Sequence, residues 1–541
     1  MKRRTMIAVS LILALALVLG ACGPAATPTP PAAQPETPQA PVTPQQPTPT
    51  PPTAPPAVGE LPALGDVTAR THLNVVLMQM PVSLHPTGSN DAYSSLVNSH
   101  IYNTLIYLDR ENNALIPALA TSWEFIDLST VNFQLREGVT FHNGQPFTAR
   151  DVQYSLESAA VAPQAALVLG MVDSVTVNDD FNVTVHLEMP FAPILLHLTH
   201  ALASIAPYGA TQEEMEAHPI GTGPFMYGGL VIGDRVDLIR NDNYWGDMPL
   251  IESITIRLIP ESSGRLLAVE TGEADIALDI EAPDVGPAET FPNVDLRRIA
   301  GLRTTYIAFN TQKPPFDNLL VRQAINYAIP LEPIIDAVFM GVSVPAVGPL
   351  APGVFGWTDL PPSEFNPERA RELMIEAGHA DGFDAYIWYN IPDQARRDIS
   401  EILQNLLREI NINLTVVGLE LADYLDRARA GEHDMMILGW TTVTGDADYG
   451  LFPMFHSESI GINNYSFWGT PELDDLLERG RTETDVEVRL ELYRQAQVII
   501  QDAMPWIFMY HDEWLVATSL DLRGFNVNPA RNHNFARVWF D

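Results

Sequence analysis

The chain has 541 residues, too many for one hydrophobic core, and its length predicts roughly two to four folding units. Lys and Arg number 30 against 67 Asp and Glu, and the resulting net charge of −37 repels phosphate backbones and argues against a nucleic-acid partner. With 46% apolar residues the chain can bury a sizeable interior, and a single cysteine, Cys22, excludes an intramolecular disulfide and a zinc–thiolate cluster.

The N-terminus has the order of a secretory signal. Basic residues 2–4 precede an apolar run of 14 residues over 6–19, which predicts a signal peptide at 1–21. The run is shorter than the roughly 20 residues that cross a bilayer core, so a membrane-spanning anchor is disfavoured.

Residues 19–22, LGAC, resemble the lipobox of bacterial lipoproteins. The resemblance implies that Cys22 carries the lipid, palmitate included, and holds the protein extracytoplasmically at the cell membrane, on the cell surface or in the periplasm; a cysteine at an ordinary cleavage site is the alternative.

A proline-rich segment follows the cysteine. Residues 24–56 hold 14 Pro and seven Thr, with Glu36 as the only charged residue. Such a composition cannot form a core and favours an extended chain. We therefore expect residues 22–58 to be a linker that tethers the globular part to its lipid.

From about residue 71 the pattern alternates between strands and capped helices. Asn366 followed by Pro367, with Gly378 beyond the last apolar residue, is typical of a helix start and stop. Thr148 with Asp151 three residues later resembles a capping box. The globular part is therefore expected to have an α/β fold.

The segment 385–440 is the most informative part of this pattern. Its apolar runs and helical periodicity predict strand 385–389, helix 394–408, strand 412–417, helix 421–430 and strand 435–438. Right-handed crossovers make such strands parallel, and ligands of open α/β sheets bind beyond the carboxyl ends of the strands. Tyr389 and Trp440 both lie at those ends, so we expect them to line a cleft. The alternative is that each aromatic simply covers the rim of the sheet.

Motifs for catalysis are absent from the sequence. It contains no G-x-S-x-G elbow, phosphate loop, H-E-x-x-H or dinucleotide glycine run, which indicates neither an enzyme nor a cofactor. His197 and His200 are spaced to share a helix face, but leucines surround them, so we predict no metal site. Residues 446–450 resemble a calcium loop only faintly, and we interpret them as a solvated turn.

Residues 135–152, LREGVTFHNGQPFTARDV, resemble the signature of the dipeptide/oligopeptide branch, family 5, of ABC-transporter solute-binding proteins. The resemblance covers roughly residues 73–541. Further matching segments are 118–123 (ALATSW), 221–225 (GTGPF), 271–275 (TGEAD), 309–311 (FNT) and 315–317 (PFD).

The resemblance implies a two-lobed, periplasmic-binding-protein-like (type II) fold with an additional subsidiary domain. Two lobes would close on a ligand about strands that cross between them, and the monomer would deliver its ligand to a membrane permease with ATPase subunits. By this analogy lobe I comprises 71–102, 223–302 and 516–541, the subsidiary domain 103–222, and lobe II 303–515.

Binding residues are carried over position by position. Peptide-binding relatives hold the ligand's ammonium with an Asp where this chain has Val443, and dipeptide-binding relatives place a carboxylate-binding Arg where it has Tyr389. The stretch 439–448, GWTTVTGDAD, is instead similar to glutathione-binding members. The ligand-binding residues that the resemblance implies are Asn90, Asp91, Ala92, Arg303, Tyr389, Gly439, Trp440, Thr441, Thr442 and Asp446.

Within this set we expect Asp91 to bind an ammonium group, Arg303 a carboxylate, and the two aromatics to form walls. Each residue also has a structural alternative: Arg303 as an ion-pair partner, Asp91 as a turn former, and Thr441 and Thr442 as residues of the cleft edge. The function expected is capture of a short peptide or peptide-like solute, glutathione among them, for import. An exported hydrolase of peptides or glycans and a ligand sensor without transport are the alternatives, and a hydrolase would need a nucleophile or carboxylate pair that no motif supplies.

Overall fold

The computed structural model describes residues 70–109, 114–391 and 393–541. The expected signal peptide at 1–21, the lipidated Cys22 and the whole linker at 22–58 lie outside the described residues, so these predictions stay predictions. In the described ranges, no helix has both the length and the apolar character to cross a membrane.

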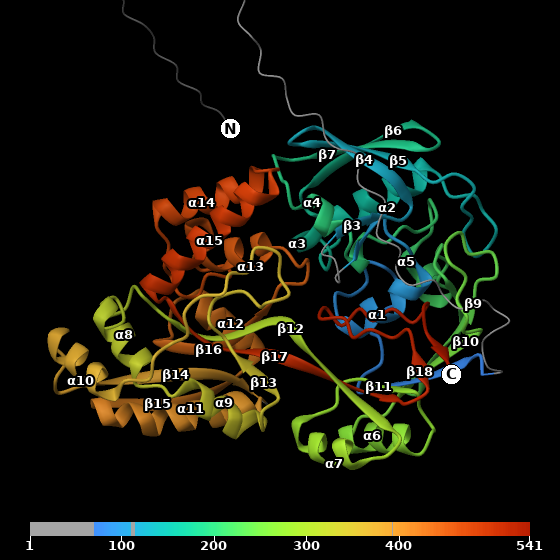
Figure 1. Ribbon diagram of the computed structural model, residues 1–541. Helices are drawn as coiled ribbons and strands as arrows, with labels where there is room; N and C mark the ends of the chain where they lie inside the picture. Colours follow the sequence, from blue (N-terminus) through green and yellow to red (C-terminus); the bar gives the residue numbers. More distant parts are fainter. Residues whose placement is uncertain (1–69, 110–113, 392) are drawn as a thin grey trace, which may run out of the picture. The chain divides into compact units, whose positions relative to one another are not determined.

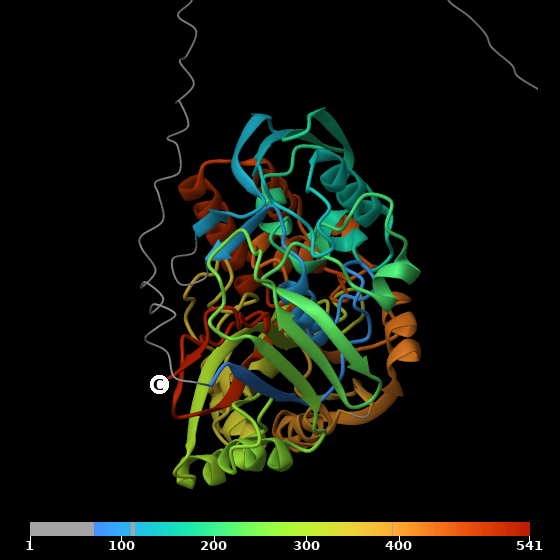
Figure 2. The ribbon, with the colours of Figure 1, turned by 90° about the vertical axis from the view of Figure 1, so that its right-hand side faces the viewer.

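One large mixed sheet of eleven strands takes its strands from residues 72–519. Its strands, in spatial order, are β15 (Ile412–Glu420), β14 (Phe383–Ile391), β16 (Met435–Thr441), β12 (Val294–Phe309), β17 (Trp506–Ser519), β11 (Ile276–Ala277), β1 (His72–Leu77), β10 (Ser253–Leu258), β9 (Arg235–Arg240) and β8 (Phe225–Val231), with β13 (Ser343–Pro345) paired to β17. Figure 2 shows the green strands β8 to β10 beside the blue β1.

The two longest strands, β12 and β17, run from one half of this sheet to the other (Figure 1). The first part of β12, up to Ala300, pairs antiparallel with the last part of β17, and from Thr304 onwards β12 pairs with the first part of β17 and with β16. The register shifts between Ala300 and Thr304. Gly301 lies at this shift because a Cβ there would come 2.5 Å from the indole nitrogen of Trp514. We call this region the strand crossing.

Helices cover both faces of the half that contains β14, β15 and β16. Along β12, β14 and β16, successive apolar residues point to opposite faces of the sheet, and the residues on each face form a separate cluster. We call the two sides the α11 face and the α12 face. The α11 face is covered by α8 (Leu319–Tyr327), α9 (Leu331–Phe339), α10 (Pro367–Glu376), α11 (Gln394–Leu406) and η3 (Leu407–Ile410). The α12 face is covered by α12 (Leu421–Arg429), α13 (Ala447–Phe455), α14 (Pro471–Thr482) and α15 (Val486–Ala503), with η4 (Ser457–Ser459) between α13 and α14.

The other half of the large sheet has its own packing. Its buried residues come from 73–102, 206–278 and 516–540 and form a further cluster, with a smaller one beside it. Its remaining elements are α1 (Ala92–Ile101), α6 (Ser262–Glu270), η2 (Ala282–Asp284), α7 (Val285–Thr290) and the paired strands β18 (Leu522–Arg523) and β19 (Trp539–Phe540).

A four-stranded antiparallel sheet and its helices have a core of their own, built from residues 105–205 together with Tyr449. We call this the small-sheet body; the boundaries expected above for it and for the two lobes stay predictions. Its elements are β2 (Ile106–Asp109), β3 (Ala114–Pro117), β4 (Ala120–Asp127), β5 (Thr130–Leu135), α2 (Ala149–Val161), α3 (Ala166–Leu169), β6 (Val172–Asp179), β7 (Asn182–Leu187), α4 (Ile194–His197) and η1 (Ala201–Ala203). The next helix, α5 (Gln212–Ala217), packs its buried Met215 into the cluster of the half that contains β8.

The local predictions from the sequence are largely confirmed. The segment 385–440 forms three strands and two helices, and β14 pairs parallel with both β15 and β16. The Asn366 side chain accepts a hydrogen bond from the Arg369 backbone at 3.0 Å, and Asp151 accepts one from the Thr148 backbone at 2.7 Å.

Two local expectations are wrong. His197 and His200 do not share a helix: His197 ends the four-residue α4, and His200 caps η1. Residues 446–450 are no solvated turn, because Asp446 caps α13 and the whole segment is buried. Sequence spacing alone does not reveal that this helix starts inside the protein.

Candidate functional site

Three of the predicted binding residues meet at the strand crossing. Arg303 on β12 lies opposite Thr441 on β16, and Thr305 lies opposite Gly439. Because strand side chains alternate between faces, Arg303, Gly439 and Thr441 belong to the α11 face. The Arg303 side chain lies over Gly439, where a Cβ would come 2.4 Å from its Nε atom, so the glycine leaves room for the guanidinium.

The charge of Arg303 is balanced by Asp512 on β17. The Arg303 Nε and Asp512 Oδ2 atoms are 3.7 Å apart, an ion pair too long for a hydrogen bond. Both atoms are buried, and neither has a hydrogen-bond partner among the described residues. Burial raises the pKa of Asp512, while the guanidiniums of Arg303 and Arg396 oppose that rise. Arg303 is thus an ion-pair partner, as the structural alternative held. The pair is long, and Arg303 Nε and Asp512 Oδ2 can each still form a hydrogen bond.

Tyr389 lies on the same α11 face, where β14 ends. It pairs with Gly418 on β15, and a Cβ at Gly418 would come 2.8 Å from the tyrosine ring and hydroxyl. Next to it, Arg396 in the first turn of α11 is 3% exposed, and its guanidinium bonds to Asn390 and lies 3.2 Å from Asp393. Sequence reasoning missed Arg396. The signal was an arginine on the face of a predicted helix that also carries Ile399 and Leu403, which are buried.

Trp440 points to the opposite side of the sheet from Tyr389. Its side chain packs against the clusters of the α12 face and of the small-sheet body, whereas Tyr389 packs on the α11 face. The indole Nε1 donates to the Tyr449 carbonyl at 2.8 Å, and the two rings stack at 5.4 Å. The two aromatics therefore do not face one another as walls of one cleft. They share a sheet edge as expected, but strand parity separates their side chains.

Thr442 and Asp446 are internal. Thr442 is 3% exposed, and its backbone donates to the Leu302 carbonyl at 2.9 Å. Asp446 is fully buried and forms an ion pair with Arg489 of α15 at 2.7 Å. In this arrangement both residues hold the chain together, and a role for them in contacting a solute stays a prediction.

The predicted residues at 90–92 open helix α1. Asp91 caps the helix, with its Oδ1 accepting from the backbones of Tyr93 at 3.0 Å and Ser94 at 2.9 Å. Its Oδ2 is buried without a partner among the described residues. Asn90 is exposed and Ala92 is partly buried. Asp91 is therefore a turn former, as the alternative held, and it retains one carboxylate oxygen that can accept a donor.

A cluster that sequence reasoning missed lies beside the crossing. The Arg531 guanidinium carbon is 4.6 Å from the centre of the Trp514 ring and 5.0 Å from that of Tyr93. Arg531 donates to the Tyr93 hydroxyl at 2.9 Å and also bonds to Asp279. Burial and the Asp279 carboxylate raise the pKa of Tyr93 to about 12, so this hydroxyl stays protonated. No local pattern joins these residues, which come from four distant segments.

The two groups of charges adjoin at Asp512, whose pKa is influenced by Arg303, Arg396, Asp393 and Arg531. We call the whole set the charged crossing: Arg303, Arg396, Arg531, Asp279, Asp393 and Asp512. It presents both signs of charge at one place, which suits a zwitterionic solute better than a purely apolar one. In the part of the chain that the structure describes, no group of three His, Cys, Asp or Glu side chains is placed to hold a metal ion.

Comparisons with known proteins agree with this architecture. The family model described as bacterial extracellular solute-binding proteins, family 5 Middle, matches residues 114–461. Heme-binding protein A of Haemophilus influenzae is 31% identical over 466 residues, covering 80% of this chain and 85% of its own. The dipeptide-binding protein of Escherichia coli is 30% identical over 476 residues (81% and 88%), and the glutathione-binding protein GsiB of Pectobacterium atrosepticum is 31% identical over 468 residues (83% and 90%).

Solved structures resemble the chain over most of its length. HbpA2 of Haemophilus parasuis superimposes with a TM-score of 0.82 at 29% identity, covering 87% of this chain and 100% of that one. DppA of Helicobacter pylori, solved in complex with the peptide STSA, gives a TM-score of 0.72 at 28% identity, covering 87% and 98%. The expected α/β fold, two-lobed and periplasmic-binding-protein-like (type II) with a subsidiary domain, is confirmed.

Proposed function

Because this chain belongs to the bacterial extracellular solute-binding proteins of family 5, we propose that it captures a short peptide or peptide-like solute, glutathione among them, and delivers it to the permease of an ABC importer. Proteins of this family are non-enzymatic transport components that act outside the cytoplasm, so the chain is a solute-binding component rather than a hydrolase. A sensor that binds the same solute without transport remains the alternative.

The charged crossing is the observation that supports a peptide-like solute. A peptide carries an ammonium and a carboxylate at neutral pH, and Arg303 offers its guanidinium to the carboxylate. The buried Oδ2 atoms of Asp91 and Asp512 lack hydrogen-bond partners in the described chain, and leaving a buried acceptor unpaired costs about 1–3 kcal/mol or more. An ammonium group bound at either atom would remove that cost. We assign a supporting role to Trp440, Thr442 and Asp446, which fix the positions of the strands and helices that carry the binding residues.

Solute binding would stabilise a closed form of the two lobes. A solute at the strand crossing would contact both halves of the molecule that β12 and β17 connect. The permease would then distinguish loaded from empty protein by its shape.

Calorimetric titration of the purified protein with glutathione, a zwitterionic dipeptide and hemin tests the proposal. We expect glutathione or the dipeptide to bind, and Arg303→Gln to weaken that binding at least tenfold, which corresponds to about 1.4 kcal/mol. Arg298→Gln is the matched control, because Arg298 lies on the same strand but pairs at 3.6 Å with Glu289 away from the crossing. Binding of hemin alone, or equal loss in both variants, would refute a peptide-like solute.

The lipid anchor is a separate part of the proposal. Cells fed labelled palmitate should label the full-length protein and fail to label Cys22→Ala. Equal labelling of both proteins would show that the cysteine does not carry the lipid.

A further inference from the structure

The small-sheet body contacts the α12 face through residues that do not belong to the charged crossing. The segment that contains Phe191 and α4 lies against α13 and α14 (Figure 1). The backbone of Ala192 donates to the Arg481 carbonyl at 2.6 Å. The rings of His197 and Tyr449 meet edge to face at 6.3 Å, and Tyr449 is part of the small-sheet core although it belongs to α13.

Arg481 is the centre of this contact. Its guanidinium makes two hydrogen bonds to Asp448, at 2.8 and 3.2 Å, and the Asp448 side chain is 3% exposed. The same guanidinium carbon lies 3.5 Å from the centre of the Phe452 ring and 5.4 Å from that of Phe191. A bidentate, partly desolvated arginine stacked on aromatic rings is among the stronger polar contacts that proteins make. We call Phe191, Ala192, His197, Asp448 and Arg481 the outer clasp.

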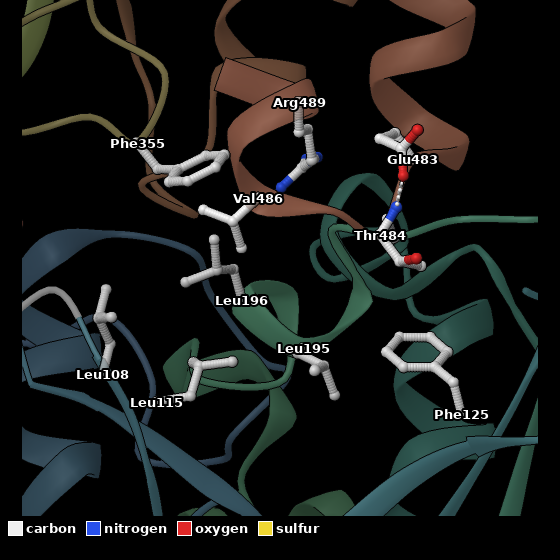
Figure 3. Close-up of a pocket in the computed structure, with 11 residues that line it drawn as sticks. Leu108, Leu115, Phe125, Leu195, Leu196, Phe355, Glu483, Thr484, Val486 and Arg489 are labelled. Carbon is white, nitrogen blue, oxygen red and sulfur yellow. Dashed lines mark hydrogen bonds between the residues drawn. The ribbon is translucent and has the colours of Figure 1, made fainter. Parts of the chain in front are cut away.

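The packing around the clasp is incomplete. An apolar cavity of about 240 Å³ separates Leu195 and Leu196 of α4 from Val486 and Phe355 (Figure 3). Apolar contact across this interface is incomplete at this pocket, although Tyr449 packs into the small-sheet core beside it. The polar and aromatic contacts of the clasp therefore add to a partial apolar contact. An interface of this kind can open and re-form.

The opposite end of the small-sheet body is attached to the half of the sheet that contains β8. His142 makes three hydrogen bonds to the chain that leads into β8: its backbone donates to the Gly221 carbonyl at 2.9 Å, its Nδ1 accepts from the Gly221 backbone at 3.3 Å, and its Nε2 donates to the Gly223 carbonyl at 3.0 Å. Gly223 in turn donates to the Ile101 carbonyl at 2.8 Å. The expected family signature at 135–152 thus contains the residue that fixes this junction.

From these contacts we infer that Arg481 is a positioning residue for solute binding. The outer clasp joins the small-sheet body to the α12 face, and it forms only when the two halves of the molecule, which β12 and β17 connect, are closed. The body moves with the β8 half through His142, so opening the halves separates Phe191 from Arg481. Arg481 touches no residue of the charged crossing. It sets the fraction of molecules in the closed, binding-competent form, and the observed affinity scales with that fraction.

The inference rests on the proposed function only for its binding readout. The primary readout needs no solute: spin labels at Val161 of α2 and Ile375 of α10, both well exposed, report the distance between the two bodies in the full chain with Cys22→Ser. Arg481→Gln should shift the label-to-label distances of the solute-free protein to longer values. With glutathione or a dipeptide as the probe, its dissociation constant should rise roughly tenfold.

Two further variants make the result decisive. Arg481→Lys keeps a charge over Phe452 but cannot make both bonds to Asp448, so its distances and affinity should fall between those of the wild type and Arg481→Gln. Arg479→Gln removes an exposed pair with Asp475 on the same helix and should match the wild type. Identical distances in the wild type and Arg481→Gln overturn the inference, as does an equal shift in Arg479→Gln. If no probe binds the wild type, the proposed function fails, while the distances still decide the role of the clasp.

Discussion

The charged crossing and the outer clasp each contain an Arg–Asp pair, and the two pairs are built differently. At the crossing, Arg303 and Asp512 are 3.7 Å apart, both side chains are partly exposed, and the facing atoms have no hydrogen-bond partners in the described chain. At the clasp, Arg481 bonds Asp448 twice, and the carboxylate is almost completely buried.

The Arg303–Asp512 pair has atoms free to form hydrogen bonds with another molecule, whereas Arg481 and Asp448 already bond to each other twice. The solute site that we propose lies where the protein leaves hydrogen-bonding capacity unused. The Arg481–Asp448 pair of the clasp uses that capacity itself, so a ligand would gain little from this pair. Between these two pairs, hydrogen-bond satisfaction, more than charge or residue type, therefore distinguishes the pair that we propose binds a solute from the pair that holds two elements together.

The largest expected effect concerns Asp446, which the sequence places in the binding site and the structure places beside Arg489. Asp446→Ala leaves the Arg489 guanidinium buried without its counter-charge, and breaking such a pair costs about 3–5 kcal/mol. We expect the free energy of unfolding in urea to fall by about that amount. Asp475→Ala, which breaks an exposed pair, should change it by less than about 0.5 kcal/mol. If Asp446→Ala leaves the protein stable but abolishes solute binding, Asp446 contacts the solute directly.

The next effect tests the crossing through its glycine. A methyl group at position 439 would come 2.4 Å from Arg303 Nε, so Gly439→Ala must displace the guanidinium. Solute affinity should fall roughly tenfold, about 1.4 kcal/mol, while stability changes by less than about 1 kcal/mol. Gly286→Ala is the control because nothing lies within 4 Å of its added Cβ. Unchanged calorimetric affinity for Gly439→Ala would show that the position of Arg303 does not matter to the solute.

A smaller effect is expected at Trp440, between the two regions. Trp440→Phe keeps an aromatic ring but removes the donor to the Tyr449 carbonyl, at a cost of about 1 kcal/mol in the free energy of unfolding. If the indole supports Tyr449 rather than contacting the solute, affinity should change less than about twofold. A larger loss of affinity than of stability would show that the indole belongs to the binding surface.

The smallest effect is a pH dependence at the clasp. Burial lowers the pKa of His197, whose charged neighbours are Asp446, Asp448 and Arg481, and its Nε2 has no hydrogen-bond partner in the described chain. The closed form therefore favours neutral histidine, and an opened clasp lets it take a proton as pH falls through about 6.5. Acid thus favours the open form, and closure is complete only above that pH.

Solute affinity should fall about threefold between pH 7.5 and pH 5.5 because of this group. His197→Asn preserves a donor toward the Val168 carbonyl, which the imidazole Nδ1 contacts at 2.6 Å, and should flatten the profile. His186→Gln, at a partly buried histidine on β7, outside the clasp, should leave the profile as in the wild type. Identical profiles for His197→Asn and the wild type would contradict a role for His197.

The local elements and the family could be predicted from the amino-acid sequence. Periodicity predicted the alternating strands and helices over 385–440, and their parallel order followed from the handedness of crossovers, because both depend on nearby residues and general geometry. The cap at Asn366 and the 135–152 signature were read in the same way. The resemblance placed Arg303, Gly439 and Thr441 in one expected binding set, and the pairing of β12 with β16 brings the three together; their contact with a solute stays a prediction.

The packing of distant segments, in contrast, sets which side chains face one another and which polar atoms have hydrogen-bond partners. Tyr389 and Trp440 diverge because the pairing of β14 with β16 puts them on strand positions of opposite parity. Arg531 and Asp279 are 252 positions apart in the chain and meet through packing that no local pattern encodes. An aspartate has the same letter whether it caps a helix, is buried against an arginine or awaits a ligand, since its role depends on the partners that folding brings within hydrogen-bond distance.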